Sequence, residues 1–232
     1  MKFRHQPLLV WAIWLVLTAA AAQAAWHGHW SILFLAVSSF LLTLAPSLFV
    51  SRFDIVLPAK FLSGVCLFVF ATLFLGEAFD FYERFWWWDM ILHGASAVGL
   101  GIVGFVFLFF LFEGDRYAAP AGPLAMLSFC FAVSIGAVWE IFEFVMDQTF
   151  GMNMQKSGLV DTMWDLIVDC LGAGIAALAG YLYLKRREGG FVSDLIEEFI
   201  DANRRRFSLR RGRQRLKPGA RGEDRWRGPP HP

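Results

Sequence analysis

The sequence has few charged residues and few cysteines, and each shortage restricts the kind of protein it can be. Only 18% of the 232 residues are charged, whereas 57% are hydrophobic and 25 are Phe. This composition excludes an ordinary soluble domain and indicates an all-α protein that crosses a membrane several times. The three cysteines, Cys66, Cys130 and Cys170, lie in apolar runs without Cys-x-x-Cys spacing. Neither a disulfide framework nor a thiolate metal site is therefore expected.

Basic residues are scarce everywhere except at the C-terminal end. Before Lys185 there are seven Lys or Arg against thirteen Asp or Glu, and from Lys185 onward there are fourteen against seven. Lys and Arg beside membrane spans mark the cytoplasmic side. Lys2 and Arg4 at the start, and residues 185–187 after the last apolar run, therefore predict an inner (plasma) membrane protein with both termini in the cytoplasm.

The apolar runs predict a transmembrane domain over residues 1–184 and a cytoplasmic basic tail over residues 185–232. Six runs have roughly the length that a bilayer requires. We expect spans at about residues 8–25, 32–50, 59–79, 90–112, 123–146 and 163–184. The first run also fits a signal peptide cleaved near Ala22-Gln23-Ala24, but we favour a retained helix because further spans follow closely.

The tail divides into a patterned part and an unpatterned part. Phe191, Leu195 and Phe199 recur at helical spacing, which predicts a short amphipathic helix. Beyond Ala202 the chain is rich in Arg, Gly and Pro, so we expect disorder. Such a segment can bind anionic lipid headgroups, at about 1 kcal/mol per basic residue, or serve only to fix the topology. Nucleic acid is not an expected partner, because the tail lacks interleaved aromatics and a folded motif.

Carboxylates accumulate in spans that should exclude them. Residues three, four or seven apart share one face of a helix. The acids and one histidine follow this spacing: Asp89 and His93 open the fourth span, Glu140, Glu143 and Asp147 lie on the fifth, and Asp161, Asp165 and Asp169 lie on the sixth. An Asp at mid-membrane costs roughly 2.5–3.5 kcal/mol on an insertion scale. Such residues therefore indicate a functional site.

Further into the membrane, the residues on these same helix faces are small. They continue as Ala97, Gly101 and Gly104 in the fourth span, Gly136 and Ala132 in the fifth, and Gly172, Ala173, Ala176 and Gly180 in the sixth. Small faces allow transmembrane backbones to approach closely. We therefore expect three helices packed through these faces, with their polar ends opening into one outward-facing pocket.

The acids need compensating positive charge. Arg84 and Lys156 are the only basic residues in the external loops around these spans, so either protons or a divalent cation must supply it. One imidazole with several carboxylates suits Mg²⁺, Mn²⁺, Zn²⁺ or iron. The candidate metal ligands are Asp89, His93, Glu140, Glu143, Asp161 and Asp165, and the candidate catalytic groups are Glu140, Glu143 and Asp169. Bound protons would instead indicate a relay or coupled transport. For Asp89 and Asp161 a helix N-cap is the structural alternative.

The order of these motifs resembles a known family. Asp89-x-x-x-His93, Glu140-x-x-Glu143 and Asp161-Thr162-x-x-Asp165, followed by Asp169, are similar to the signature of the YjdF-like inner-membrane proteins, and more remotely to VanZ-like proteins. The resemblance covers about residues 80–182. It implies a helical integral-membrane fold and marks the same site residues, but it implies no activity.

Three classes of function remain open from the sequence. The first is a metal-dependent enzyme acting on a lipid or lipid-linked substrate from the external side. The second is an ion- or proton-coupled permease, although we find no inverted repeat and no pair of Gly- or Pro-broken helices. The third is a non-catalytic membrane scaffold. The oligomeric state is not predicted.

Overall fold

The fold is entirely helical over the residues that the structure, a computed structural model, describes: 6–53, 56–112, 120–185 and 190–215. This confirms the predicted all-α class. The helices in chain order are α1 Leu8–His27, α2 Trp30–Phe53, α3 Ala59–Val69, the π-helix η2 Phe70–Ala78, α4 Phe81–Arg84, α5 Trp88–Leu111, α6 Ala121–Phe150, α7 Leu159–Leu184 and α8 Phe191–Arg215. The predicted topology signals at Lys2, Arg4, Arg186 and Arg187, and the tail from residue 216, lie outside the described residues.

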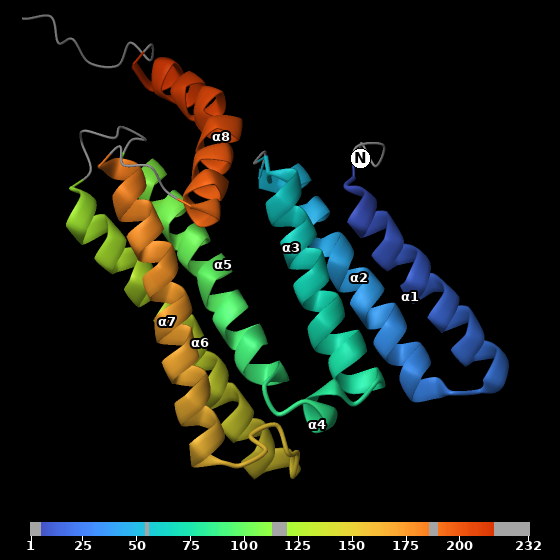
Figure 1. Ribbon diagram of the computed structural model, residues 1–232. Coiled ribbons are helices and arrows are strands. Elements are labelled where there is room, and N and C mark those ends of the chain that lie inside the picture. Colours follow the sequence, from blue (N-terminus) through green and yellow to red (C-terminus); the bar gives the residue numbers. More distant parts are fainter. Residues whose placement is uncertain (1–5, 54–55, 113–119, 186–189, 216–232) are drawn as a thin grey trace, which may run out of the picture.

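Five segments are long and apolar enough to cross a bilayer. They are α1, α3 continued by η2, α5, α6 and α7. The remaining predicted span, the second, at about residues 32–50, corresponds to α2, whose apolar part is shorter, Trp30–Pro46. These six segments alternate in direction, so the start of α1 and helix α8 lie at the same end of the bundle (Figure 1). We call the opposite end, where α5 and α7 begin, the site end.

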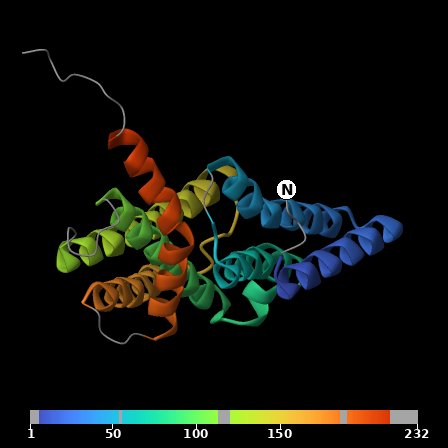
Figure 2. The same cartoon turned by 90° about the horizontal axis from the view of Figure 1, so that it is seen from above.

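The helices form two groups, each with a core of its own (Figures 1 and 2). In the first group α1, α2, α3 and η2 bury a cluster that includes Val10, Trp14, Leu17 and Phe74. In the second group α5, α6 and α7 meet around a separate cluster, which also receives α8. The candidate site therefore belongs to a three-helix unit that has its own packing.

Close backbone contact holds the second group together, as the small faces predicted. Gly101, Gly172 and Gly180 are buried. A Cβ added at Gly172 would collide with the carbonyl oxygen of Gly94 and would lie 3.0 Å from the Cβ of Ala97. Helices α5 and α7 can therefore approach this closely only with glycine at position 172.

Helix α8 is longer than the short helix that the sequence predicts. It runs from Phe191 to Arg215, past the Ala202 boundary that the apolar spacing indicates. Arginine is a good helix former, and its repetition after residue 203 continues the helix begun by the apolar face. Helix α8 also contacts the first group: Asn203 bonds both backbone groups of Val56, and Lys60 Nζ lies 3.3 Å from Glu198 Oε2.

The π-helical turns of η2 were not predicted, since hydropathy does not distinguish them from an α-helix. They end beside the short helix α4. The ring of Tyr82 occupies the space where a side chain at Gly76 would lie. Asp80, between the two elements, has φ of 57°, a left-handed conformation that Asp tolerates better than most residues. This arrangement brings Tyr82 and Glu83 to the site end of the bundle.

Candidate functional site

His93 lies at the centre of the acidic residues and faces carboxylates from all three helices of the second group. Its side chain is buried in the second turn of α5. Nδ1 is 3.4 Å from Asp169 Oδ2 of α7, and Nε2 is 3.6 Å from Glu140 Oε1 of α6 and 3.9 Å from Asp89 Oδ1 of α5 itself. Acids from distant parts of the sequence therefore meet on one imidazole, at the site end of the bundle.

Three residues of this acidic group could hold a metal ion. One ligand atom each from Asp89, His93 and Asp165 can be chosen so that all three lie within 4.8 Å of one another. The Asp165 side chain is 2% exposed, and the Asp89 side chain is partly open to the cavity described below. Carboxylate oxygen and imidazole nitrogen together suit Mg²⁺, Mn²⁺, Zn²⁺ or iron.

Two buried oxygens beside this group lack hydrogen-bond partners. Oδ2 of Asp165 and Oδ1 of Asp169 are inaccessible and accept no hydrogen bond from the part of the chain that the structure describes. A buried acceptor without a partner costs free energy. A cation or protons at this position would offset that cost, so the residues fit a bound divalent ion.

Local packing sets where two of the carboxylates lie. A Cβ added at Gly136 of α6 would collide with Oδ2 of Asp169, so glycine at 136 makes room for that carboxylate between α6 and α7. Trp139 Nε1 donates a hydrogen bond of 2.8 Å to Oε1 of Glu143. Glu143 itself faces the cavity and makes no described contact with His93.

The loop from Gly151 to Gly158 uses the remaining acids for its own structure. Asp147 accepts hydrogen bonds from the backbone N–H groups of Met154 (2.7 Å) and Gln155 (2.9 Å). Asp161 accepts one from the N–H of Lys156 (3.1 Å). Asp147 and Asp161 therefore anchor the loop beside the site, whereas the predicted role of Asp161 as a metal ligand stays a prediction.

The N-cap alternative for Asp89 and Asp161 is wrong. Helix α5 begins at Trp88, and its N-cap is Trp87. Helix α7 begins at Leu159 after Gly158. Both aspartates therefore lie within the first turn, where a negative charge still favours the helix dipole, and their side chains are turned toward His93 and the loop respectively.

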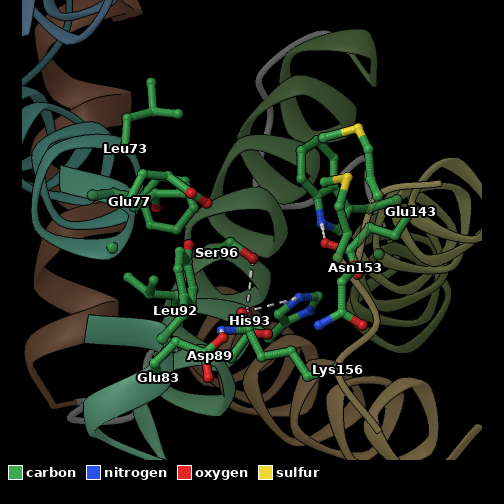
Figure 3. Close-up of a pocket in the computed structure, with 18 of the residues that line it drawn as sticks. Leu73, Glu77, Glu83, Asp89, Leu92, His93, Ser96, Glu143, Asn153 and Lys156 are labelled. Atoms are coloured by element: carbon green, nitrogen blue, oxygen red, sulfur yellow. Dashed lines mark hydrogen bonds and ion pairs between the residues drawn. The ribbon is translucent and has the colours of Figure 1, made fainter. Parts of the chain in front are cut away.

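A cavity of about 600 Å³ opens beside the cluster, between the two helix groups. Asp89, His93 and Glu143 contribute to its wall (Figure 3). Other parts of the wall come from η2, α4 and the loop: Thr72, Leu73, Gly76, Glu77, Tyr82, Glu83, Met152, Asn153, Met154 and Lys156. Its size and mixed lining are typical of a small-molecule or headgroup site.

Sequence reasoning did not assign Glu77, Tyr82, Glu83 and Lys156 to the site. The first three precede the recognised motifs, and Lys156 lies in a polar loop. Lys156 had one signal in the sequence, namely that it is one of two basic residues in the external loops around the site. The convergence of η2 and α4 on the loop is a long-range contact that helical periodicity does not encode.

A family model described as a predicted membrane protein, DUF2238, matches residues 7–186. The chain belongs to this family. The YjdF-like proteins are the DUF2238 family, so the resemblance on the acidic motifs is confirmed. The DUF2238 match includes α1 to α7 and ends before α8, so helix α8 and the basic tail lie outside the matched residues.

The description of the similar protein found names no activity. A protein of Thermotoga maritima, described only as an uncharacterized protein, is 32% identical over 118 residues, which are 51% of this chain and 59% of the relative. No solved structure matches this DUF2238 chain. The residues of the site are therefore the basis for inferring a function.

Proposed function

We propose that this protein is a membrane-embedded, divalent-metal-dependent enzyme that acts on a lipid or lipid-linked substrate at the external face of the inner (plasma) membrane. The observation that carries the proposal is the Asp89, His93 and Asp165 group, with ligand atoms within 4.8 Å of one another. It is supported by the unpartnered buried oxygens beside that group and by the adjoining cavity.

The chain's own residues divide into ligands, positioning residues and a base. Asp89, His93 and Asp165 are the ligands of the metal, which when bound supplies Lewis-acid polarisation of a substrate oxygen. Asp169 holds the His93 ring at Nδ1, which is how a neighbouring carboxylate orients a ligand imidazole. This leaves Nε2 for the metal, and Glu140 Oε1 lies 3.6 Å from that nitrogen. Glu143 is the general base, because it faces the cavity and the Trp139 indole holds one of its oxygens.

The location of the cavity supports a lipid substrate. It lies at the site end of helices whose outer surfaces are apolar, and residues such as Trp86 and Trp139 are exposed near it. Exposed tryptophans are typical of the headgroup level of a bilayer. A headgroup can therefore enter the cavity while its acyl chains stay in the membrane.

Metal binding is the first test of the proposal. Elemental analysis of the wild type in lipid nanodiscs, after a mild chelator wash, should find stoichiometric divalent metal. His93→Ala and Asp165→Asn should lose it, because each removes a ligand. Asp169→Asn should weaken metal affinity by about 10–100-fold, because it removes the carboxylate that orients the His93 ring but removes no ligand.

Asp201→Asn is the matched control for this experiment, because it removes an exposed carboxylate from α8 at the opposite end. It should retain wild-type metal. A monodisperse, helical wild type without metal would overturn the proposed enzyme and leave proton-compensated carboxylates, which is the starting point for a permease.

The orientation is tested by cysteine labelling. With Cys66, Cys130 and Cys170 replaced by Ala, Ser157→Cys in the loop at the site end should react with a membrane-impermeant maleimide in intact cells. Asp201→Cys on α8 should react only after the cells are permeabilised. Reversed labelling would place the site in the cytoplasm and contradict the external substrate.

A further inference from the structure

The cavity wall is strongly asymmetric in charge. Its carboxylates are Glu77, Asp80, Glu83, Asp89 and Glu143, and the one Lys or Arg that contributes to it, among the described residues, is Lys156. An anionic group entering the cavity is therefore repelled by most of the wall. Lys156 is the exception, and its surroundings show what it can bind.

The Lys156 ammonium lies at the mouth of the cavity, where the loop meets α4. Its Nζ is 2.6 Å from Oε1 of Glu83 and 5.2 Å from the centre of the Tyr82 ring. The side chain extends across the site toward Glu83 and Asp89, close to His93 (Figure 3). The cation therefore lies next to the candidate metal group, in the wall of the cavity.

The Lys156 backbone is held in place independently of its side chain. Its N–H donates to Asp161 Oδ2 at 3.1 Å. The neighbouring Gln155 side chain donates to Thr162 Oγ1 at 2.6 Å, and the Gln155 N–H donates to Asp147. The loop is thus fixed to α6 and α7, which carry the site. A fixed backbone reduces the entropy lost when a side chain binds a ligand.

The partner of Lys156 is one that a ligand can replace. The Glu83 side chain is 68% exposed, and such exposed ion pairs contribute little to stability. Tyr82 is different. Burial, together with the negative charges of Asp89 and Glu77, raises the pKa of its phenol above the ordinary value. The ring therefore remains neutral and offers its face to the ammonium.

We infer that Lys156 binds the phosphate group of the ligand that enters this cavity, exchanging its bond to Glu83 for one to a phosphate oxygen. The inference deepens the proposed function and rests on it: the substrate is a phosphate-bearing molecule, with the metal group on one side of the phosphate and Lys156 on the other. Lysine and divalent metals are the usual partners of phosphate in proteins.

The acidic wall also makes phosphate binding depend on the metal. Without a cation at Asp89, His93 and Asp165, the carboxylates repel the phosphate from the position next to Lys156. Phosphate binding should therefore need both the metal and Lys156, and removal of either should weaken it.

Binding of dioctanoyl phosphatidic acid to the metal-loaded protein in phosphatidylcholine nanodiscs tests the inference. Titration followed by native mass spectrometry should show Lys156→Gln binding about tenfold more weakly than the wild type, as expected for one charge-assisted hydrogen bond. Lys156→Arg, which keeps the charge, should bind like the wild type.

Glu83→Gln separates a ligand role from a structural one. If Lys156 binds the ligand, removal of its competing partner should strengthen binding. If the Lys156–Glu83 pair only ties α4 to the loop, Glu83→Gln should weaken binding as much as Lys156→Gln does, and that result would overturn the inference. Equal binding of dioctanoylglycerol, which has no phosphate, would overturn it as well.

Two further measurements identify the source of the phosphate and distinguish failure of the phosphate inference from failure of the proposed metal-dependent enzyme. Displacement of the lipid by inorganic phosphate at similar concentrations would assign the site to free phosphate, whereas weak displacement would assign it to the phospholipid. Metal content is measured on each sample. Metal-loaded wild type that binds neither probe would overturn the inference while leaving the metal site intact. Lys156-dependent binding by a metal-free wild type would instead contradict the proposed enzyme.

Discussion

Gly172→Ala is expected to unfold at a lower temperature than the wild type and to lose the bound metal. The added methyl group collides with the Gly94 carbonyl oxygen and lies 3.0 Å from the Ala97 Cβ. A backbone oxygen cannot move away without moving α5. Overpacking of this kind costs about 1–3 kcal/mol. Since α5 carries Asp89 and His93 and α7 carries Asp165, separation of the helices also separates the ligands.

Gly174→Ala is the control on the same helix. A Cβ at position 174 meets nothing within 4 Å, and alanine is the better helix former by about 1 kcal/mol. This variant should therefore be as stable as the wild type or more stable, with full metal content. Thermal unfolding followed by circular dichroism, with elemental analysis of the same samples, checks both. Equal unfolding temperatures for the two variants would contradict close α5–α7 contact at Gly172.

Asn203→Ala is expected to destabilise the protein through the contact between its two helix groups. Asn203 is 1% exposed. Its Oδ1 accepts a hydrogen bond from the Val56 N–H at 2.8 Å, and its Nδ2 donates to the carbonyl oxygens of Val56 at 2.7 Å and Phe199 at 2.8 Å. Alanine leaves both backbone groups of Val56 without this partner. The free energy of unfolding should fall by about 1–3 kcal/mol for each group that stays buried and unsatisfied.

Asp201→Ala, two positions away on the exposed side of α8, should have little effect on unfolding. The metal content of Asn203→Ala should stay at the wild-type level, because the site lies at the other end of the second group. Denaturant titration in a mild detergent measures the stability difference. An unchanged midpoint for Asn203→Ala would show that α8 does not hold the two groups together.

The sequence predicted the parts of the site that depend on helical periodicity. Asp89 and His93, four residues apart, do share one face of α5, and Asp165 and Asp169 share one face of α7. Shared faces specify the direction of a side chain around a helix, not its partner in space. For that reason periodicity could not separate Asp165, which joins His93, from Asp161, which bonds the loop.

Other features depended on information that a local pattern lacks. The π-helical geometry of η2 arises within a run that hydropathy predicts as an ordinary span. The pairing of Lys156 with Glu83 joins residues 73 positions apart, and no spacing rule connects them. The length of α8 beyond Ala202 is not encoded in the apolar spacing, because abundant Arg is compatible both with disorder and with a helix.

The bonds between Val56 and Asn203 join residues 147 positions apart. During synthesis the three helices α5, α6 and α7 emerge and can pack before α8 has left the ribosome, since their core is formed largely by residues before 185. Val56 can be bonded only after Asn203 has been translated. The attachment of the first group to α8 is consequently a late step of folding, and a chain truncated before residue 203 would lack it.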